Sequence, residues 1–304
     1  MAKIFNCLVV RFAEKIDCMH FYQDIERDIK SLWNKDLIEE ANQLNSKLNG
    51  IYFENNVFPM YFNGNIQSNT VLIMLNPGFE DRTFSFFKSV KQQYKKSLED
   101  YLKDYIHSIP FKANEEDEFN RIDNFDTKQA AFLYHFDNKG FELPLNFWKT
   151  KGNLKLAKRD QMLNKLQLEF IPYCSKTFKG LFDTGEKAKQ NYEFIEKYLL
   201  RLLDTIQSFP RENILFCSKQ FYFLLQAAAE TPLFKDKIVF EETKSLPIGN
   251  LNLRFNKVSI LYNNQTIKAG IAHSFASQAL PNAYEMMAEY GKFCYENLHS
   301  NKIS

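Results

Sequence analysis

The chain has 304 residues, of which 45% are hydrophobic and 25% are charged, and its formal net charge is +2. These values are normal for a soluble globular protein, and the length allows a sizeable core in one large or two ordinary domains. A net charge this small argues neither for nor against a nucleic-acid partner, because local patches of charge matter more than the total.

The residue pattern disfavours membrane and disulfide-rich proteins. No apolar run approaches the roughly 18–20 residues that a membrane span needs, and the amino terminus fits a signal peptide poorly. The five cysteines are odd in number and widely spaced, without a C-x-x-C pair, so neither a disulfide framework nor a zinc site is indicated. We expect a cytoplasmic protein without a membrane partner, a metal or a cofactor.

The first predicted element is an amphipathic helix over residues 21–48, where apolar residues recur at helical spacing. One break could divide this helix in two. Asn49-Gly50 follows as a stop signal. A turn-rich segment over residues 51–69 leads to an apolar run over residues 71–75, whose length indicates a strand buried on both faces. The strand ends at Asn76-Pro77-Gly78, since proline disfavours helical geometry in the residue before it.

Helices and strands alternate through the rest of the chain. An acidic segment over residues 114–126 is expected to be a solvated loop. A basic stretch over residues 149–165 is either a solvated face or a nucleic-acid contact that flanks the site. The other predicted elements are, in chain order, helices over residues 94–106 and 127–136, a strand over 166–171, a helix over 183–206, a strand over 214–217, a helix over 218–229, a hairpin of strands 251–262 and 266–272 around Asn263-Asn264, and a helix over 282–298.

This order indicates an α/β fold with a largely parallel sheet. We predict a three-layer α/β/α sandwich with a four-stranded, largely parallel central sheet and right-handed crossovers that place helices on both faces. A single domain is expected over residues 1–304, with residues 1–62 as an N-terminal helical elaboration and residues 63–298 as the core. The four strands that should lie side by side cover residues 71–75, 168–171, 214–217 and 267–272.

Parallel strands present their carboxyl ends at one edge of a sheet, where open α/β sheets bind their ligands. The loops after the four strands are rich in amide, hydroxyl, imidazole and ammonium groups, which suit a pocket for a polar planar ring and a phosphate. These loops are Asn76-Pro77-Gly78-Phe79, Pro172-Tyr173-Cys174-Ser175-Lys176, Cys217-Ser218-Lys219 and Ala272-His273-Ser274-Phe275-Ala276-Ser277.

The same residues also have purely structural interpretations. Asn76 can belong to a turn, His273 can be a structural histidine, and Ser218 can cap the helix that follows it. Cys174 and Cys217 are expected to be small buried hydrophobic residues. The chain has no P-loop, no G-x-S-x-G or G-x-G-x-x-G motif, and no histidine pair at metal-ligand spacing.

Three segments together resemble a known family. Val71-Leu-Ile-Met-Leu-Asn76-Pro-Gly78 is similar to the first motif of the uracil-DNA glycosylase superfamily, and closest to its mismatch-specific and single-strand-selective branches, whose motif is Gly-x-Asn-Pro-Gly. Leu168-Glu-Phe-Ile-Pro172-Tyr173-Cys174-Ser175 resembles the second strand of that superfamily, and Gly270-Ile-Ala-His273-Ser274 falls where its His-Pro-Ser motif closes the last strand. The resemblance covers about residues 63–298 and implies an α/β/α sandwich with a four-stranded parallel core.

The resemblance implies a hydrolase that cleaves the N-glycosidic bond of a flipped uracil-type or modified base in DNA. Asn76 would orient a water, although an amide cannot act as a general base, and His273 would donate a hydrogen bond to the departing base. The resemblance further implies two groups of contacts: Phe79 or Tyr173 would stack on the base, and Ser175, Lys176, Ser274 and Ser277 would hold flanking phosphates.

Two other functions remain open. The chain departs from the family pattern before Asn76, where the run that ends at Leu75 contains no glycine, and at Ser274 and Phe275, which stand where Pro and Ser are usual. These departures favour a nucleotide-binding or nucleic-acid-binding module of the same fold that is catalytically weak or inactive. The chain could also be an interaction protein whose helical segment over residues 21–48 binds a partner.

Overall fold

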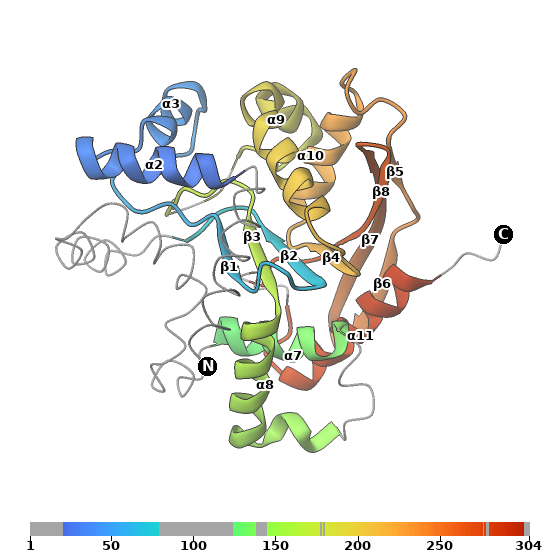
Figure 1. The fold of residues 1–304 in the computed structure, drawn as a ribbon. Coiled ribbons are helices and arrows are strands. Elements are labelled where there is room, and N and C mark those ends of the chain that lie inside the picture. Colours follow the sequence, from blue (N-terminus) through green and yellow to red (C-terminus); the bar gives the residue numbers. More distant parts are fainter. Residues whose placement is uncertain are drawn as a thin grey trace, which may run out of the picture.

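The computed structural model describes residues 21–78, 124–137, 145–176, 178, 180–275, 277 and 280–300. These residues form a mixed α/β fold around an eight-stranded sheet with the order β1-β3-β2-β4-β8-β7-β5, and β6 pairs with β7 beside this path (Figure 1). The strands are β1 (Phe62–Gly64), β2 (Thr70–Met74), β3 (Leu166–Glu169), β4 (Asn213–Phe216), β5 (Ile238–Phe240), β6 (Lys244–Ile248), β7 (Leu251–Tyr262) and β8 (Gln265–Ile271).

The four predicted strands are neighbours, as expected. β3, β2, β4 and β8 lie side by side and all pair in parallel. The expectation of four strands in total is wrong, because four further strands extend this core and pair antiparallel at both edges. The hairpin of β7 and β8 turns at Asn263 and Asn264, whose φ angles are positive, at 46° and 61° respectively. This hairpin adds β7 to the sheet. β7 then supplies the pairing edges for β5 and β6.

Helices cover both faces of the sheet (Figure 1). One face carries α9 (Gly185–Gln207) and α10 (Gln220–Ala229), and the opposite face carries α7 (Asn124–Phe136), α8 (Lys151–Asn164) and α11 (Tyr284–His299). A short 3-10 helix, η1 (Leu145–Lys149), precedes α8. The helix predicted over residues 94–106 and nearly all of the acidic segment lie outside the described residues. No helix of the described part is long and apolar enough to cross a membrane.

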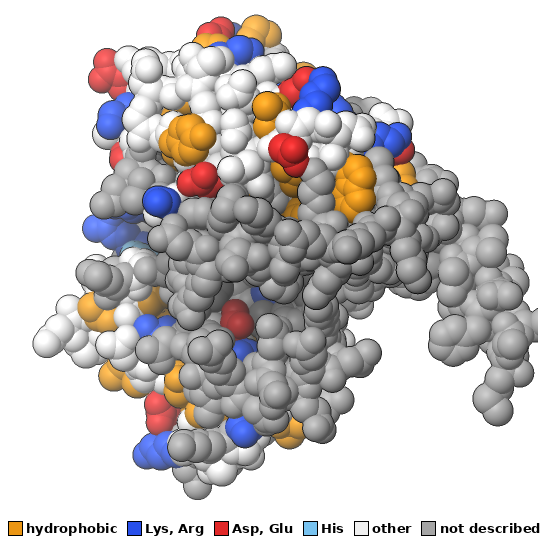
Figure 2. All heavy atoms as spheres, turned by 90° about the vertical axis from the view of Figure 1, so that its left-hand side faces the viewer, with side chains coloured by type: hydrophobic (Ala, Val, Ile, Leu, Met, Phe, Trp, Pro, Cys, Tyr) orange, Lys and Arg blue, Asp and Glu red, His pale blue; other side chains and the backbone are white. Residues whose placement is uncertain are grey.

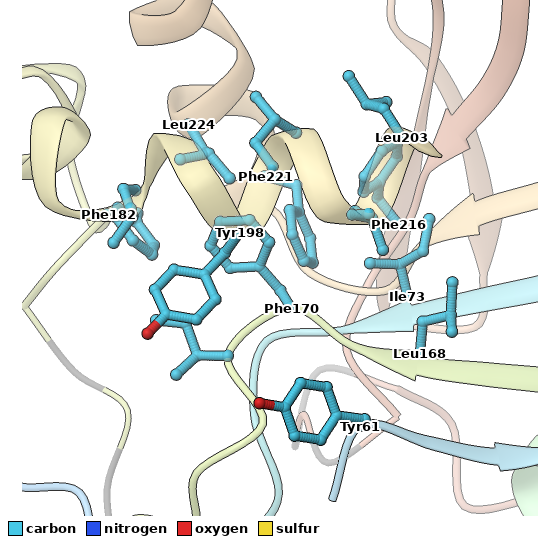
Figure 3. Close-up of a cluster of buried hydrophobic side chains, with 14 of the residues drawn as sticks. Tyr61, Ile73, Leu168, Phe170, Phe182, Tyr198, Leu203, Phe216, Phe221 and Leu224 are labelled. Atoms are coloured by element: carbon cyan, nitrogen blue, oxygen red, sulfur yellow. The ribbon is translucent and has the colours of Figure 1, made fainter. Parts of the chain in front are cut away.

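The central strand β2 separates two hydrophobic clusters. All five of its residues are buried, with Val71 and Ile73 in the cluster beneath α9 and α10 and Leu72 in the cluster beneath α7 and α11. Figure 3 shows the first cluster, in which Phe170 lies among aromatic side chains from the covering helices. Its ring centroid is 5.7 Å from that of Phe221 and 6.3 Å from that of Tyr198. The apolar run therefore forms a doubly covered strand, as its sequence predicts.

The amino-terminal helix is divided, as the sequence allowed. α2 (Tyr22–Lys35) and α3 (Glu39–Lys47) are separated by Asp36, whose φ of 56° is left-handed and ends the first helix. Later in the chain, the Thr184 side chain accepts a hydrogen bond from the backbone nitrogen of Lys187 and caps α9 at the predicted start.

A buried carboxylate attaches α2 to the sheet. Asp28 is 1% exposed, and its Oδ2 accepts hydrogen bonds from the hydroxyls of Tyr61 and Tyr173, each at 2.7 Å. Its Oδ1 accepts a third bond, at 2.9 Å, from Nε of Arg27. The guanidinium of Arg201 lies 4.8 Å from the centroid of the Tyr61 ring and donates to the Phe170 carbonyl at 2.7 Å. These contacts place α2 over the loops at the carboxyl ends of β2 and β3.

We expect Asp28→Ala to lower the free energy of unfolding by roughly 2–4 kcal/mol, because it leaves two buried tyrosine hydroxyls without their acceptor. Urea denaturation of the purified protein measures this loss. Glu26→Ala is the matched control on the same helix. Glu26 pairs with Lys30 in an exposed contact, so its loss should cost less than about 0.5 kcal/mol. Equal effects of the two substitutions would contradict a structural role for the Asp28 network.

Candidate functional site

The order of the parallel strands creates a switch point between β2 and β4. The chain leaves β2 toward β3 on one side, whereas it leaves β4 toward β8 on the other side. Connections that depart in opposite directions open a crevice outside the carboxyl ends of the two neighbouring strands. Residues 75–78 and 217–219 flank this position, so the topology places a candidate ligand site beside Asn76.

The side chain of Asn76 holds two loops together. Its amide nitrogen donates to Oγ of Ser175 at 2.8 Å, to the Tyr173 carbonyl at 3.2 Å and to the Pro77 carbonyl at 3.0 Å. The backbone nitrogen of Ser175 donates to the Pro77 carbonyl at 3.2 Å, and Gly78 forms a parallel bridge with Ser175. All of these side-chain bonds use the Asn76 nitrogen, so its oxygen Oδ1 is the atom that can accept a hydrogen bond from a ligand or a water.

His273 is half-buried at the end of β8 and is held as a neutral imidazole. Its Nε2 accepts a hydrogen bond from the backbone nitrogen of Arg254 at 3.2 Å, which assigns the ring proton to Nδ1. Burial lowers the pKa of His273, and the positive charges of Arg254 and Lys219 lower it further. The ring also contacts Tyr290 edge-on, with centroids 6.2 Å apart. The site therefore contains a neutral N–H donor at neutral pH.

Asn76 and His273 lie at the same edge of the sheet, as predicted. β4 separates β2 from β8, so their carboxyl ends are two strand spacings apart, roughly 10 Å. The pairing of β4 with β8 extends to Phe216 and Ile271, and the charge of Lys219 at the start of α10 acts on His273, so the start of α10 lies near the histidine.

The structure does not support the predicted role of Tyr173. Its side chain is 1% exposed, and its hydroxyl is bonded to Asp28 inside the core. A tyrosine buried in this way cannot stack on a base that enters from solvent. The alternative stacking residue, Phe79, lies outside the described residues.

The predicted phosphate contacts divide between the core and the edge. Ser175 is 3% exposed and its hydroxyl is engaged by Asn76, so it is a poor phosphate ligand. Lys176 is exposed, and Ser274 and Ser277 are half-buried in a turn closed by a backbone bond of 2.9 Å between them. Ser218 caps α10 by accepting from the backbone nitrogen of Gln220 at 3.2 Å, as one interpretation had it.

Both cysteines behave as the sequence suggested. Cys174 and Cys217 are buried, at 2% and 1% exposure. Burial raises the pKa of Cys174 to about 12 and the pKa of Cys217 well above its ordinary value. Neither thiol is therefore suited to nucleophilic chemistry.

The basic stretch is only partly exposed, so neither interpretation applies to two of its lysines. Lys158 and Lys165 are buried, at 4% and 1% exposure. Lys165 donates to the side chain of Gln129 and, at 2.9 Å, to Oε1 of Gln167, and Lys158 lies 3.6 Å from Asp126. These two lysines face the core and cannot contact a phosphate at the surface.

Two exposed cations lie beside His273, and sequence reasoning placed Lys219 at this edge but missed Arg254. Lys219 follows Ser218 at the start of α10, and Arg254 lies on β7 next to the histidine. Both side chains lack an acidic partner among the residues that the structure describes. Elsewhere on the face drawn in Figure 2, hydrophobic, basic and acidic side chains of the described residues are interspersed. Lys219 and Arg254 differ from the other exposed cations only because they lie next to His273. This proximity arises in the folded chain and is not visible in the linear sequence.

Sequence reasoning also missed Glu169, the last residue of β3. It is 4% exposed; its Oε1 accepts from Nε2 of Gln167 at 2.7 Å, and its Oε2 has no hydrogen-bond partner. Burial raises the pKa of Glu169 to about 7, although the hydrogen bond from Gln167 and the charge of Lys165 act in the opposite direction. The available signal was a single acidic residue inside an otherwise apolar strand end.

An open groove of about 510 Å³ lies elsewhere, at the opposite edge of the sheet. It is lined by the end of α9, by Phe209 and Arg211, and by the start of β8 with His299. This groove is at the amino ends of β4 and β8, away from Asn76 and His273. In parallel sheets ligands bind at the carboxyl ends, so we place the candidate site at the switch point.

Comparisons with protein-family models, with curated proteins and with solved structures found no match. Within the described ranges no group of three or more His, Cys, Asp or Glu residues is arranged to hold a metal ion.

The pH dependence of stability provides a test of the buried Glu169. Its folded-state pKa lies above the ordinary value of 4.5, so its contribution to stability is present below pH 4.5 and is lost as pH rises through about 7. Glu169→Gln removes this loss. Relative to the wild type, the variant should gain stability between pH 5 and pH 8, by roughly 3 kcal/mol at most.

Urea denaturation at several pH values measures that difference. Burial lowers the pKa of His135 to about 4, so its titration changes stability with pH in the opposite direction. This change is the same in both proteins and cancels when the variant is compared with the wild type. A difference that stays constant between pH 5 and pH 8 would show that Glu169 is ionised normally in the folded protein.

Proposed function

We propose that this protein is a hydrolase of the uracil-DNA glycosylase type, which cleaves the N-glycosidic bond of a uracil-type or modified base at the switch point. The observation that carries this proposal is the position of Asn76 and His273 at one sheet edge, roughly 10 Å apart, with an acceptor on one and a neutral donor on the other. The parallel core β3-β2-β4-β8 with helices on both faces suits the sandwich that the resemblance implies.

In the proposed reaction the two side chains act on opposite ends of the breaking bond. Oδ1 of Asn76 accepts a hydrogen bond from a water and holds it beneath the sugar. Negative charge develops on the base as it departs, and Nδ1–H of His273 donates a hydrogen bond to the base oxygen that receives it. A neutral imidazole suits this role, because its donor is present throughout the neutral pH range.

The exposed cations Lys219 and Arg254 supply a counter-charge for the substrate. Phosphates that flank a flipped nucleotide would lie outside the pocket, where these two side chains are exposed beside His273. Lys176, Ser274 and Ser277 remain candidates for further phosphate contacts at the same edge. Together they favour a nucleic acid or a nucleotide over an uncharged ligand.

One observation favours the alternative, a nucleotide-binding or nucleic-acid-binding module that does not cleave. The Asn76 amide makes three hydrogen bonds that hold the loops, which a structural turn would also need. The withdrawal of Tyr173 into the core removes one of the two proposed stacking residues as well. In that case the protein would bind oligonucleotides without releasing a base.

The two functions are separated by a glycosylase assay. The wild type is incubated with single-stranded and double-stranded oligonucleotides that contain uracil, and alkali-labile sites are counted. Asn76→Ala and His273→Ala should each lower the rate of base release by roughly a hundredfold or more. The first substitution removes the group that holds the water, and the second removes the hydrogen-bond donor to the departing base. Glu230→Gln, in an exposed ion pair with Lys189, is a control that should leave the rate unchanged.

Near-ultraviolet circular dichroism shows whether each variant keeps its fold. Asn76→Ala also removes the hydrogen bonds between the loops, so its melting temperature should fall more than that of His273→Ala. Oligonucleotide binding without any base release by the wild type would select the binding module. Full activity in both folded variants would refute the assigned roles.

Salt dependence tests the two cations. Lys219→Ala and Arg254→Ala should each weaken oligonucleotide binding at low salt and reduce the slope of log K against log salt concentration by about 1. Fluorescence anisotropy with a labelled oligonucleotide measures both quantities. Lys268→Ala is the matched control on the exposed face of β8. An unchanged slope in both variants would remove these side chains from the interface.

A further inference from the structure

We propose that Glu169 is the general base of this site and accepts the proton of the attacking water. The inference rests on the proposed function, because the reaction that it completes is the hydrolysis of an N-glycosidic bond. It assigns a role to the buried acid that neither the sequence motifs nor the family resemblance identified.

The position of Glu169 in the sheet places it close to the end of β2. Met74 and Glu169 are register partners in the parallel pair of β2 and β3. Asn76 lies two residues beyond Met74, so its Cα is roughly 8 Å from that of Glu169 for ordinary strand spacing and rise. The two residues are therefore neighbours across β2 and β3, and the proposed reaction requires a water to enter between their side chains.

The carboxyl group is positioned and keeps one oxygen available. Oε1 accepts from Gln167 at 2.7 Å, and Gln167 in turn accepts from the Lys165 ammonium at 2.9 Å. Gln129 of α7 also accepts a hydrogen bond from Lys165 and completes this buried chain. Oε2 of Glu169 is buried without a partner. A buried carboxylate oxygen that is left without a hydrogen bond costs stability, and such groups are typical of functional sites.

The electrostatic surroundings suit proton transfer near neutral pH. Glu169 interacts electrostatically with Lys165, Cys174 and Cys217, and Asp126 on α7 acts on Lys165. Burial is the largest influence and raises the pKa of Glu169 to about 7, while burial lowers the pKa of Lys165 to about 8. A general base is most effective when its pKa lies near the operating pH.

The reaction balances without a further reactant. The water oxygen forms a bond to the anomeric carbon of the sugar, and the bond from that carbon to the base nitrogen breaks, with the electron pair leaving on the base. Glu169 takes one proton from the water, which leaves a sugar hydroxyl. The base anion is stabilised by the hydrogen bond from His273 and is protonated by solvent after release. Asn76 orients the water but takes no proton, which an amide cannot do.

Single-turnover base release from a uracil-containing single-stranded oligonucleotide, followed from pH 5 to pH 9, tests this role. The wild-type rate should rise with pH through about 7, because the deprotonated carboxylate is the active form. Glu169→Gln keeps the shape and the hydrogen bond to Gln167 through a rotated amide, and should lower the rate at pH 8 roughly 100-fold to 10,000-fold. It should also lose the rise with pH.

Two variants guard against misinterpretation. Glu169→Asp retains a carboxyl group, so it should keep part of the rate and the dependence on pH. Glu230→Gln should match the wild type in both. Near-ultraviolet circular dichroism and a binding titration with the same oligonucleotide show whether each variant folds and binds.

The outcomes are distinct. A wild type that releases the base, with a folded Glu169→Gln variant of equal rate and equal pH profile, overturns the role of Glu169 and leaves the proposed function intact. A wild type that binds the oligonucleotide but releases no base at any pH overturns the proposed function and this inference together. Loss of rate and of the pH dependence in Glu169→Gln, with partial retention in Glu169→Asp, establishes the general base.

Discussion

The parallel pairing of β2 with β3 on one side and with β4 on the other is the constraint on which the rest of the structure depends. Every residue of β2 is buried, so the strand requires helices on both faces of the sheet. Parallel neighbours also require long crossover connections, and these are the segments that become α8, α9 and α10. The opposite departure of the chain from β2 and β4 also makes the sheet edge beside Asn76 a topological switch point.

The loops at this edge are fixed by polar contacts in addition to apolar packing. The Asn76 side chain donates hydrogen bonds to the loop after β3. Asp28, on the amino-terminal helix α2, accepts hydrogen bonds from Tyr61 and Tyr173. Directional bonds of this kind hold atoms in one arrangement more strictly than hydrophobic contacts do. These contacts hold α2 against the loops at this edge.

A second polar group is buried on the other face of the sheet. Lys165, Gln129, Gln167 and Glu169 form a connected chain beneath α7 and α8. Burying two ionisable side chains is unfavourable unless their partners are complete, and here one oxygen of Glu169 remains without a partner. In the proposed reaction, His273 would act as the donor, Asn76 as the anchor for water and Glu169 as the proton acceptor.

The sequence by itself determined the elements that local patterns encode. The apolar runs identified the four parallel strands, the Asn263-Asn264 turn identified the hairpin, and the placement of Asn76 and His273 after two of those strands identified their common edge. The short strands β1, β5 and β6 were missed, because three to five residues with mixed polarity carry no periodic signal. Pairing with a neighbouring strand creates them, and for β1 that neighbour, β3, is distant in sequence.

Only the tertiary structure decided which polar residues are buried and which are exposed. Tyr173 and Ser175 follow a strand and were expected to face a ligand, yet a helix from the start of the chain covers the tyrosine and Asn76 engages the serine. Lys165 and Glu169 are also buried by contacts that the sequence does not show. A charged side chain can be buried only when other elements supply its partners. A linear pattern specifies the period of an element, whereas the surroundings of each side chain arise from contacts across the whole fold.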